Sequence, residues 1–146
     1  MTTANIYLNF DGNCEEAFEF YRSVLGGEFA TLERYNTMPP QEGMPPIPPE
    51  MGEQIMHVSF PIGNGTVIMG SDSGGDWAPA LAQGNNFAIS LDTDIRDEAD
   101  RLFAGLSAGG NVTMPMNETF WGSYFGMFTD KFGISWMISH STAKPA

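Results

Sequence analysis

Basic residues and cysteine are scarce in this sequence. Six Lys and Arg residues stand against 18 Asp and Glu residues in a chain of 146, so the formal net charge is −12 at pH 7. A surface of this sign repels phosphate groups, and we therefore expect neither nucleic acid nor an anionic membrane as a partner. The single cysteine, Cys14, excludes an intrachain disulfide and a cysteine-rich zinc site.

Long apolar runs and nucleotide-binding motifs are also absent. No run reaches the ~18 apolar residues of a membrane span, and the first residues show no secretory signal, so we expect a cytoplasmic protein of bacterial type. The sequence contains no glycine-rich dinucleotide motif, no P-loop and no nucleophile elbow. Hydrophobic residues make up 42% of the chain, which is enough to fill the interior of one domain spanning 1–146.

The two halves of the chain resemble each other at a separation of 83 residues (94 minus 11). The matched residues are Asp11 with Asp94, Glu15 with Glu98, Phe20 with Phe103, Ile6 with Ile89, Leu8 with Leu91, and Gly26-Gly27 with Gly109-Gly110. In both halves they follow the order of strand, acidic helix start and glycine pair. This order predicts two βαβββ modules, at 4–72 and 86–140, joined by a linker at 73–85.

Local patterns predict the elements of each module. In the first module we expect strands at 5–10, 28–35, 54–62 and 66–71 and a helix at 14–25; in the second, strands at 86–91, 112–115, 122–129 and 134–139 and a helix at 95–108. Asn13 and Asp94 are the expected helix caps. Gly63-Asn64-Gly65 predicts a tight turn between two strands.

A proline-rich segment interrupts the first module. Residues 38–51 hold six of the ten prolines, which predicts an irregular loop. Such a loop covers a site, reaches a neighbouring molecule or simply connects two strands, and the sequence leaves these alternatives open.

The end of the chain carries three motifs in a fixed order: Glu118-Thr-Phe-Trp-Gly122, an aromatic strand ending in Thr129-Asp130, and Phe132-Gly133-x-x-Trp136. This order resembles the closing hairpin of the PhnB-like proteins of the vicinal-oxygen-chelate family, which includes glyoxalases, extradiol dioxygenases and bleomycin-binding proteins. The resemblance implies an α+β fold in which two βαβββ modules form a cup-shaped, incompletely closed mixed sheet with helices on its outer face. It further implies a ligand on the concave side and a homodimer.

The metal-binding pattern of that family is not matched in this chain. Its enzymes hold a divalent ion through His, Gln and Glu on the first and last strands of each module. The resemblance places Ile6, Met69, Asn86 and Met137 at those positions. Because a thioether or an alkyl group is a poor ligand for a hard divalent ion, we expect no cofactor and disfavour a metal. His57 is the one strong candidate metal ligand, and His140 is expected to be a solvated residue near the tail.

A candidate ligand site combines the polar and aromatic residues of the strands. Its members are His57, Phe60, Met69, Trp121, Tyr124, Phe125 and Met137. Strand alternation puts His57 on one face and Phe60 on the other. A two-residue turn at 64–65 would pair Phe60 with Met69 in the cup and point His57 away from it, whereas a change of one residue would reverse the two faces. The aromatic residues serve either core packing or stacking on a flat ligand.

We therefore expect metal-free binding of a small neutral or cationic organic molecule. One alternative is a divalent-metal-dependent enzyme, lyase-, isomerase- or dioxygenase-like, with a non-standard site that includes His57. Another is a non-catalytic interaction module that uses the proline-rich loop. Proteins of this subfamily are often labelled 3-demethylubiquinone methyltransferase-like, but the chain shows no glycine-rich strand–loop–helix for S-adenosylmethionine. Cys14 is expected to be inert because Glu15 and Glu16 oppose ionisation of its thiol.

Overall fold

The computed structural model describes residues 2–37, 43, 49–63, 65–73 and 81–141. They divide into two compact units, Met1–Ala82 and Gln83–Ala146. The first unit contains β1 (Ile6–Phe10), α1 (Cys14–Leu25), β2 (Thr31–Arg34), the 3-10 helices η1 (Tyr35–Thr37) and η2 (Pro49–Met51), β3 (Ile55–Gly63) and β4 (Thr66–Asp72). The second contains β5 (Ile89–Asp92), α2 (Arg96–Ser107), β6 (Asn111–Glu118), β7 (Ser123–Thr129) and β8 (Ser135–Ser141).

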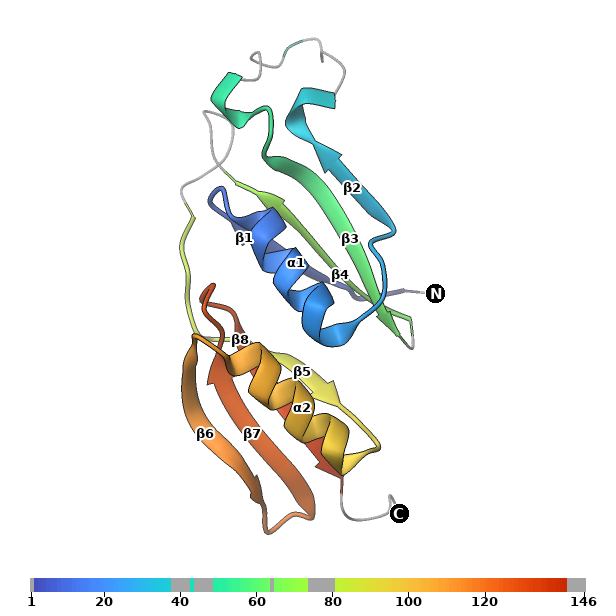
Figure 1. Cartoon of the computed structure of the whole chain (residues 1–146), viewed down its shortest axis with the longest axis vertical. Coiled ribbons are helices and arrows are strands. Elements are labelled where there is room, and N and C mark those ends of the chain that lie inside the picture. The colour runs from blue at the N-terminus through green and yellow to red at the C-terminus, as the bar shows by residue number, and fades with distance from the viewer. Residues whose placement is uncertain (1, 38–42, 44–48, 64, 74–80, 142–146) are drawn as a thin grey trace. The chain divides into compact units, whose positions relative to one another are not determined.

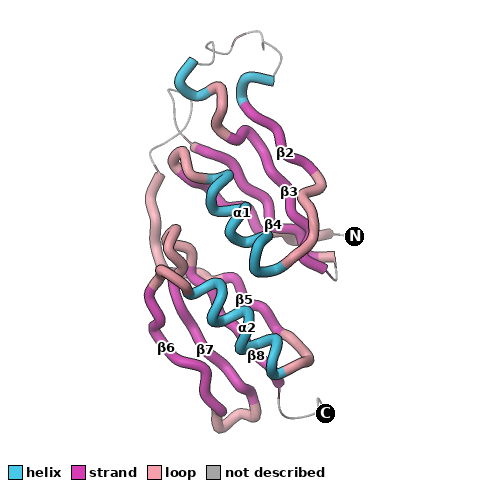
Figure 2. The backbone as a smooth tube through the Cα atoms, in the orientation of Figure 1, coloured by secondary structure: helices cyan, strands magenta, loops and turns pink. Residues whose placement is uncertain are grey.

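Both units have the same topology (Figures 1 and 2). The strand orders are β1-β4-β3-β2 and β5-β8-β7-β6, and the first strand of each unit runs parallel to the last. In each unit the helix lies across one face of its own sheet (Figure 1). The predicted α+β class and the two βαβββ modules are confirmed, with strand ends that differ from the prediction by a few residues. Among the described residues, no helix is long and apolar enough to cross a membrane.

The core of the first unit lies between α1 and its sheet. Phe18 is fully buried, and its ring meets Phe10 edge-on at a centroid distance of 6.1 Å. Gly70 of β4 makes room for Phe18, because a Cβ at residue 70 would lie 2.6 Å from the Phe18 ring. Phe60 of β3 is also fully buried, and its ring meets that of Phe29 edge-on at a centroid distance of 5.5 Å. Each buried aromatic side chain of this kind contributes ~1.5–3 kcal/mol to stability.

The core of the second unit is built in the same way. Leu106 of α2 is fully buried, as are Trp136 and Ile138 of β8. Phe103 of α2 meets Phe128 of β7 edge-on at 5.2 Å. The apolar side of α2 therefore covers alternate residues of β7 and β8, and the intervening residues lie on the opposite face of the sheet.

Asn13 is the N-cap residue of α1, as predicted, whereas the predicted cap Asp94 was wrong. Asn13 makes no side-chain hydrogen bond at the start of α1, where the Cys14 amide instead donates to Asp72 Oδ1 at 2.9 Å. Asp72 is buried and comes from the far end of the unit, so no local sequence pattern identifies it. At α2 the N-cap residue is Ile95, which likewise has no side-chain cap hydrogen bond.

Two predictions fall largely outside the described residues. Residues 38–42 and 44–48 of the proline-rich loop and residues 74–80 of the linker are not described. The described end of the loop, Pro49–Met51, forms the short helix η2.

Candidate functional site

The face of each sheet opposite its helix, which we call the open face, carries the candidate site. In the first unit, Tyr7 and Met69 are directly paired on β1 and β4, and Met69 is paired in turn with Ser59 of β3. His57 shares this face, with its ring 6.0 Å from that of Tyr7 at an interplanar angle of 27°. Tyr7 is 45% exposed, so a molecule approaching this face meets a stacked pair of rings.

Of the two predicted registers, the structure has the one shifted by one residue, so Phe60 does not pair with Met69. Gly63 pairs with Thr66, the pair that a two-residue turn requires, but Pro61 then pairs with Val67. Ile62 is therefore an extra residue in β3, and this bulge shifts the register by one. As a result Phe60 pairs with Ile68 and is buried beneath α1, while His57 lies on the same face as Met69.

In the second unit, three methionines form a row across the open face. Met114 of β6 pairs with Met127 of β7, and Met127 pairs with Met137 of β8. Residues paired in this way point to the same face with Cβ atoms ~5 Å apart. Met114 is 43% exposed and the other two are half-buried. Met114, Met127 and Met137, the methionine row, present a flexible and polarisable apolar surface.

Aromatic residues adjoin the central member of this row, Met127. Phe125 lies two residues from Met127 on the same strand and therefore on the same face. The Trp121 ring lies 6.1 Å from Phe125, and the Phe120 ring lies 4.9 Å from Trp121. Trp121 is 57% exposed and Phe120 97% exposed, in the turn that joins β6 to β7. The structure thus brings together Trp121, Phe125 and Met137 among the predicted site residues.

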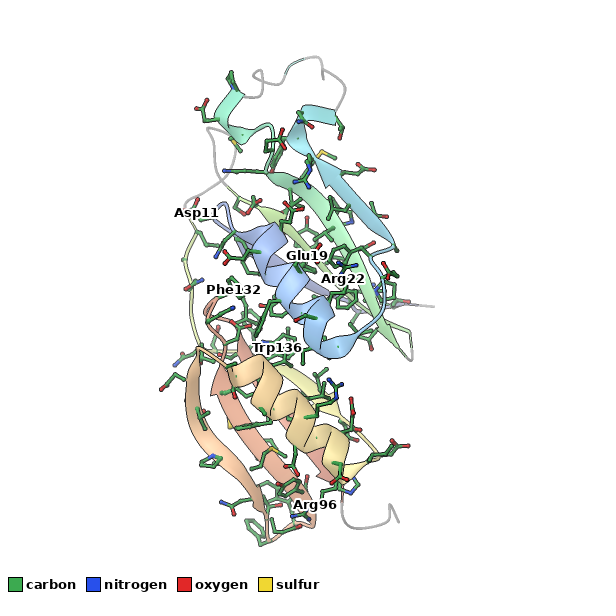
Figure 3. The ribbon with its side chains drawn as sticks, in the orientation of Figure 1. Asp11, Glu19, Arg22, Arg96, Phe132 and Trp136 are labelled. Atoms are coloured by element: carbon green, nitrogen blue, oxygen red, sulfur yellow. The ribbon has the colours of Figure 1, made fainter. Side chains whose placement is uncertain are left out.

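Tyr124 belongs to the opposite face, which corrects its predicted place in the site. Its hydroxyl donates to Asp100 Oδ1 of α2 at 2.5 Å, and this hydrogen bond raises the pKa of Tyr124. The Arg96 guanidinium lies 3.8 Å from the ring centroid and also binds Glu118 (Figure 3). Tyr124 therefore ties α2 to the sheet. His140, paired with Tyr124, is half-buried, and its Nδ1 donates to the Thr93 carbonyl at 3.0 Å, so it is not a solvated tail residue.

A polar hollow lies further along the open face, and none of its residues is among the predicted site residues. It has a volume of about 460 Å³ and is lined by Gln83, Gly84, Asn85, Thr129, Gly133 and Ser135. Thr129 and Ser135 are paired across β7 and β8. The methionine row was likewise missed, because two irregularities in the β6–β7 register set the position of Met114. Neither feature has a sequence motif.

The side chains at the family's metal positions do not suit a divalent ion. Ile6 lies on the helix face, and Asn86 precedes β5. On the open face, Met69 is paired with Tyr7 of β1, and Met137 is paired with Ser90 of β5. Phenol, hydroxyl and thioether groups are weak ligands for hard cations, which leaves the His57 imidazole, on the same face as Met69, as the one strong donor among these side chains. Within the described ranges, no three His, Cys, Asp or Glu side chains lie close enough together to hold an ion.

Cys14 is unsuited to nucleophilic chemistry. Its side chain is fully buried at the start of α1. Burial raises the pKa of the Cys14 thiol far above its usual range, and the nearby Asp72 and Glu15 raise it further. Since the thiolate is the reactive form, this thiol serves as a small core residue.

The chain is similar over nearly its whole length to characterised sequences and structures. A family model described as 3-demethylubiquinone-9 3-methyltransferase matches residues 2–139. Protein YjdN of Escherichia coli (strain K12) is 35% identical over 144 residues, which cover 95% of each chain. The solved structure of protein PA1353 from Pseudomonas aeruginosa is 35% identical, with a TM-score of 0.83 over 97% of this chain and 98% of that chain.

Two more distant structures share the fold. A putative 3-demethylubiquinone-9 3-methyltransferase, PhnB protein, from Bacillus cereus is 24% identical, with a TM-score of 0.71 over 96% of this chain and all of that chain (100%). A glyoxylase/bleomycin resistance protein/dioxygenase domain from Frankia sp. EAN1pec is 15% identical, with a TM-score of 0.62 over 97% and 92% of the two chains. The βαβββ modules are thus those of the vicinal-oxygen-chelate fold.

Proposed function

The chain belongs to the PhnB-like family, whose model is described as 3-demethylubiquinone-9 3-methyltransferase, within the vicinal-oxygen-chelate superfamily, and we propose that it binds a small organic molecule without a metal. The observation that supports this most strongly is the methionine row with the aromatic residues beside it. Met114, Met127 and Met137 run across three strands, and Phe125 and Trp121 adjoin them. An apolar, adaptable surface with nearby polar groups is typical of ligand sites.

The methyltransferase description has no support in the chemistry of the first strand–helix connection. That connection contains a single glycine, Gly12, and the first helical amide, that of Cys14, is already bound to Asp72. A helix N-terminus occupied by a buried carboxylate leaves no place for an anionic cofactor group. Metal-dependent catalysis is disfavoured because the donor groups directly paired with Met69 and Met137 are weak ligands for a divalent ion.

Titration with the neutral fluorophore Nile red tests the proposed site. We expect wild-type protein to enhance and blue-shift its emission, and Met127→Glu to weaken binding at least tenfold, about 1.4 kcal/mol. The reason is that Met127 lies at the centre of the row, where a carboxylate would be partly desolvated. Val112→Glu is the matched control: Val112 is 44% exposed and pairs with Phe128, so it lies on the other face of the same sheet.

Both variants carry the same added charge, and circular dichroism will show whether each is folded. The proposal fails if wild-type protein leaves Nile red emission unchanged, or if Met127→Glu binds as well as Val112→Glu does.

We also propose that the protein is a homodimer. Phe87, Phe120 and Trp121 are 64%, 97% and 57% exposed, and such large apolar side chains are favourable in a protein interface. Sedimentation velocity is expected to give about twice the chain mass of 15.9 kDa. Phe120→Lys, at the most exposed of the three, is expected to shift the distribution towards monomer. A wild-type species at the mass of one chain would contradict the proposal.

A further inference from the structure

The polar hollow lies next to the methionine row on the open face of the second unit. The row includes the pair Met127 and Met137, and the hollow includes the pair Thr129 and Ser135. Each member of the second pair lies two residues from its counterpart on the same strand, and so points to the same face. One face therefore presents an apolar strip beside a polar recess.

One lining residue of the hollow, Gly133, belongs to a hydrogen-bonded turn. Gly133 has a φ of +89°, and a Cβ there would lie 2.7 Å from Gln83 Oε1, so a side chain at residue 133 would displace Gln83. The Gln83 side-chain amide donates to the Phe132 carbonyl at 3.1 Å. Asp130 Oδ1 accepts hydrogen bonds from the amides of Phe132 and Ile134. Hydrogen bonds within the protein thus hold the turn and Gln83 in place, and such preorganisation lowers the entropic cost of binding.

The lining of the hollow selects for hydrogen bonding without charge. Its side chains are the amides of Gln83 and Asn85 and the hydroxyls of Thr129 and Ser135, all of which donate and accept. None of the six lining residues is ionisable. The two charged residues in the adjacent turn are engaged elsewhere: Asp130 is buried and hydrogen-bonded, and Lys131 lies over the Phe132 ring.

An anionic group in this recess would find no cation among the lining residues and would face a chain of net charge −12. A cationic group would lack a carboxylate among the lining residues. Either ion would lose hydration without gaining an oppositely charged partner among these residues, whereas a neutral carboxamide or hydroxyl group finds both donors and acceptors.

We infer that the polar hollow binds the uncharged polar end of the ligand, a carboxamide or hydroxyl group, while the ligand's flat apolar body lies on the methionine row. This inference rests on the proposed function, and it narrows the ligand from small organic molecules to neutral amphiphilic ones.

A matched pair of probes tests the inference in the full chain. Naphthalene-2-carboxamide and 2-naphthoate have nearly the same shape, but the second is an anion. By calorimetry we expect wild-type protein to bind the carboxamide at least tenfold more tightly than the carboxylate. The double variant Thr129→Val, Ser135→Ala removes two hydroxyls with little change of shape. It is expected to weaken carboxamide binding about tenfold and to leave Nile red binding unchanged.

The outcomes separate this inference from the proposed function. Equal binding of the two naphthalenes, preference for the carboxylate, or no binding of either while Nile red still binds would overturn the inference and leave the proposed function standing. Unchanged carboxamide binding by the double variant would also overturn it. Nile red binding that is insensitive to Met127→Glu would overturn the proposed function itself.

Discussion

Asp130→Ala is expected to lower the free energy of unfolding by about 3–5 kcal/mol. The Asp130 carboxylate is buried, with 3% of its surface exposed. Oδ1 accepts from the amides of Phe132 and Ile134 at 2.8 and 3.0 Å, and Oδ2 accepts from Trp136 Nε1 at 2.8 Å. Alanine would leave three donors without this acceptor, and each buried donor left unsatisfied costs ~1–3 kcal/mol.

Urea unfolding followed by circular dichroism measures this effect. Asp130→Asn keeps the carbonyl oxygen for the two amides but turns an NH₂ group towards Trp136, so an intermediate loss is expected. Asp94→Ala, at an exposed residue before α2, is the control, with a change of no more than ~0.5 kcal/mol. If Asp130→Ala and Asp94→Ala unfold at the same urea concentration, the Asp130 carboxylate does not stabilise the turn.

Gly110→Ala is expected to lower the free energy of unfolding by at least ~3 kcal/mol, which is at the upper end of the effects of overpacking. A Cβ at residue 110 would lie 2.2 Å from the Thr129 carbonyl oxygen and 2.9 Å from backbone atoms of Asp130. Both sides of the clash are held: the Gly110 amide donates to Ser107 at the end of α2, and Asn111 pairs with Thr129. No rotation of a side chain relieves it, so the start of β6 must move.

The control for this substitution is Gly84→Ala. A Cβ at residue 84 would meet nothing nearer than Asn86 Oδ1 at 3.7 Å, and its φ is not in the left-handed region. Thermal unfolding is expected to show a lower Tm for Gly110→Ala and a Tm near that of wild type for Gly84→Ala. Equal Tm values would show that the backbone approach at residue 110 is softer than the structure indicates.

The glycine pairs show why the fold was predictable from the sequence. Gly26-Gly27 and Gly109-Gly110 mark the same point in both modules, and both end a helix as predicted. Their physical reasons differ, however. Gly26, Gly27 and Gly109 have positive φ angles, whereas Gly110 is needed because the neighbouring strand approaches it closely. A repeat reveals that two places correspond without revealing what each residue does there.

The site was less predictable because it depends on register. A second bulge, at Met56, lies in β3 where Glu33 pairs with His57 and Arg34 with Ile55. Alternation alone therefore misassigns residues on either side of it. Tyr124 and Phe125 illustrate the same limit, since adjacent aromatic residues serve opposite faces. The polar hollow depends on Gln83, which lies far from Thr129 in the chain and reaches Gly133 only in the folded unit.

The bulge at Ile62 also bears on how relatives of this protein should be compared. The side chains of a strand alternate between two faces, and the extra residue at Ile62 decides which set of β3 side chains points away from the helix. Insertion or deletion of one residue in this hairpin would place Val58 and Phe60 on the open face in place of His57 and Ser59, without any substitution. In such a lineage, identical residues would carry different roles, so homologous positions have to be counted from the bulge rather than from the turn.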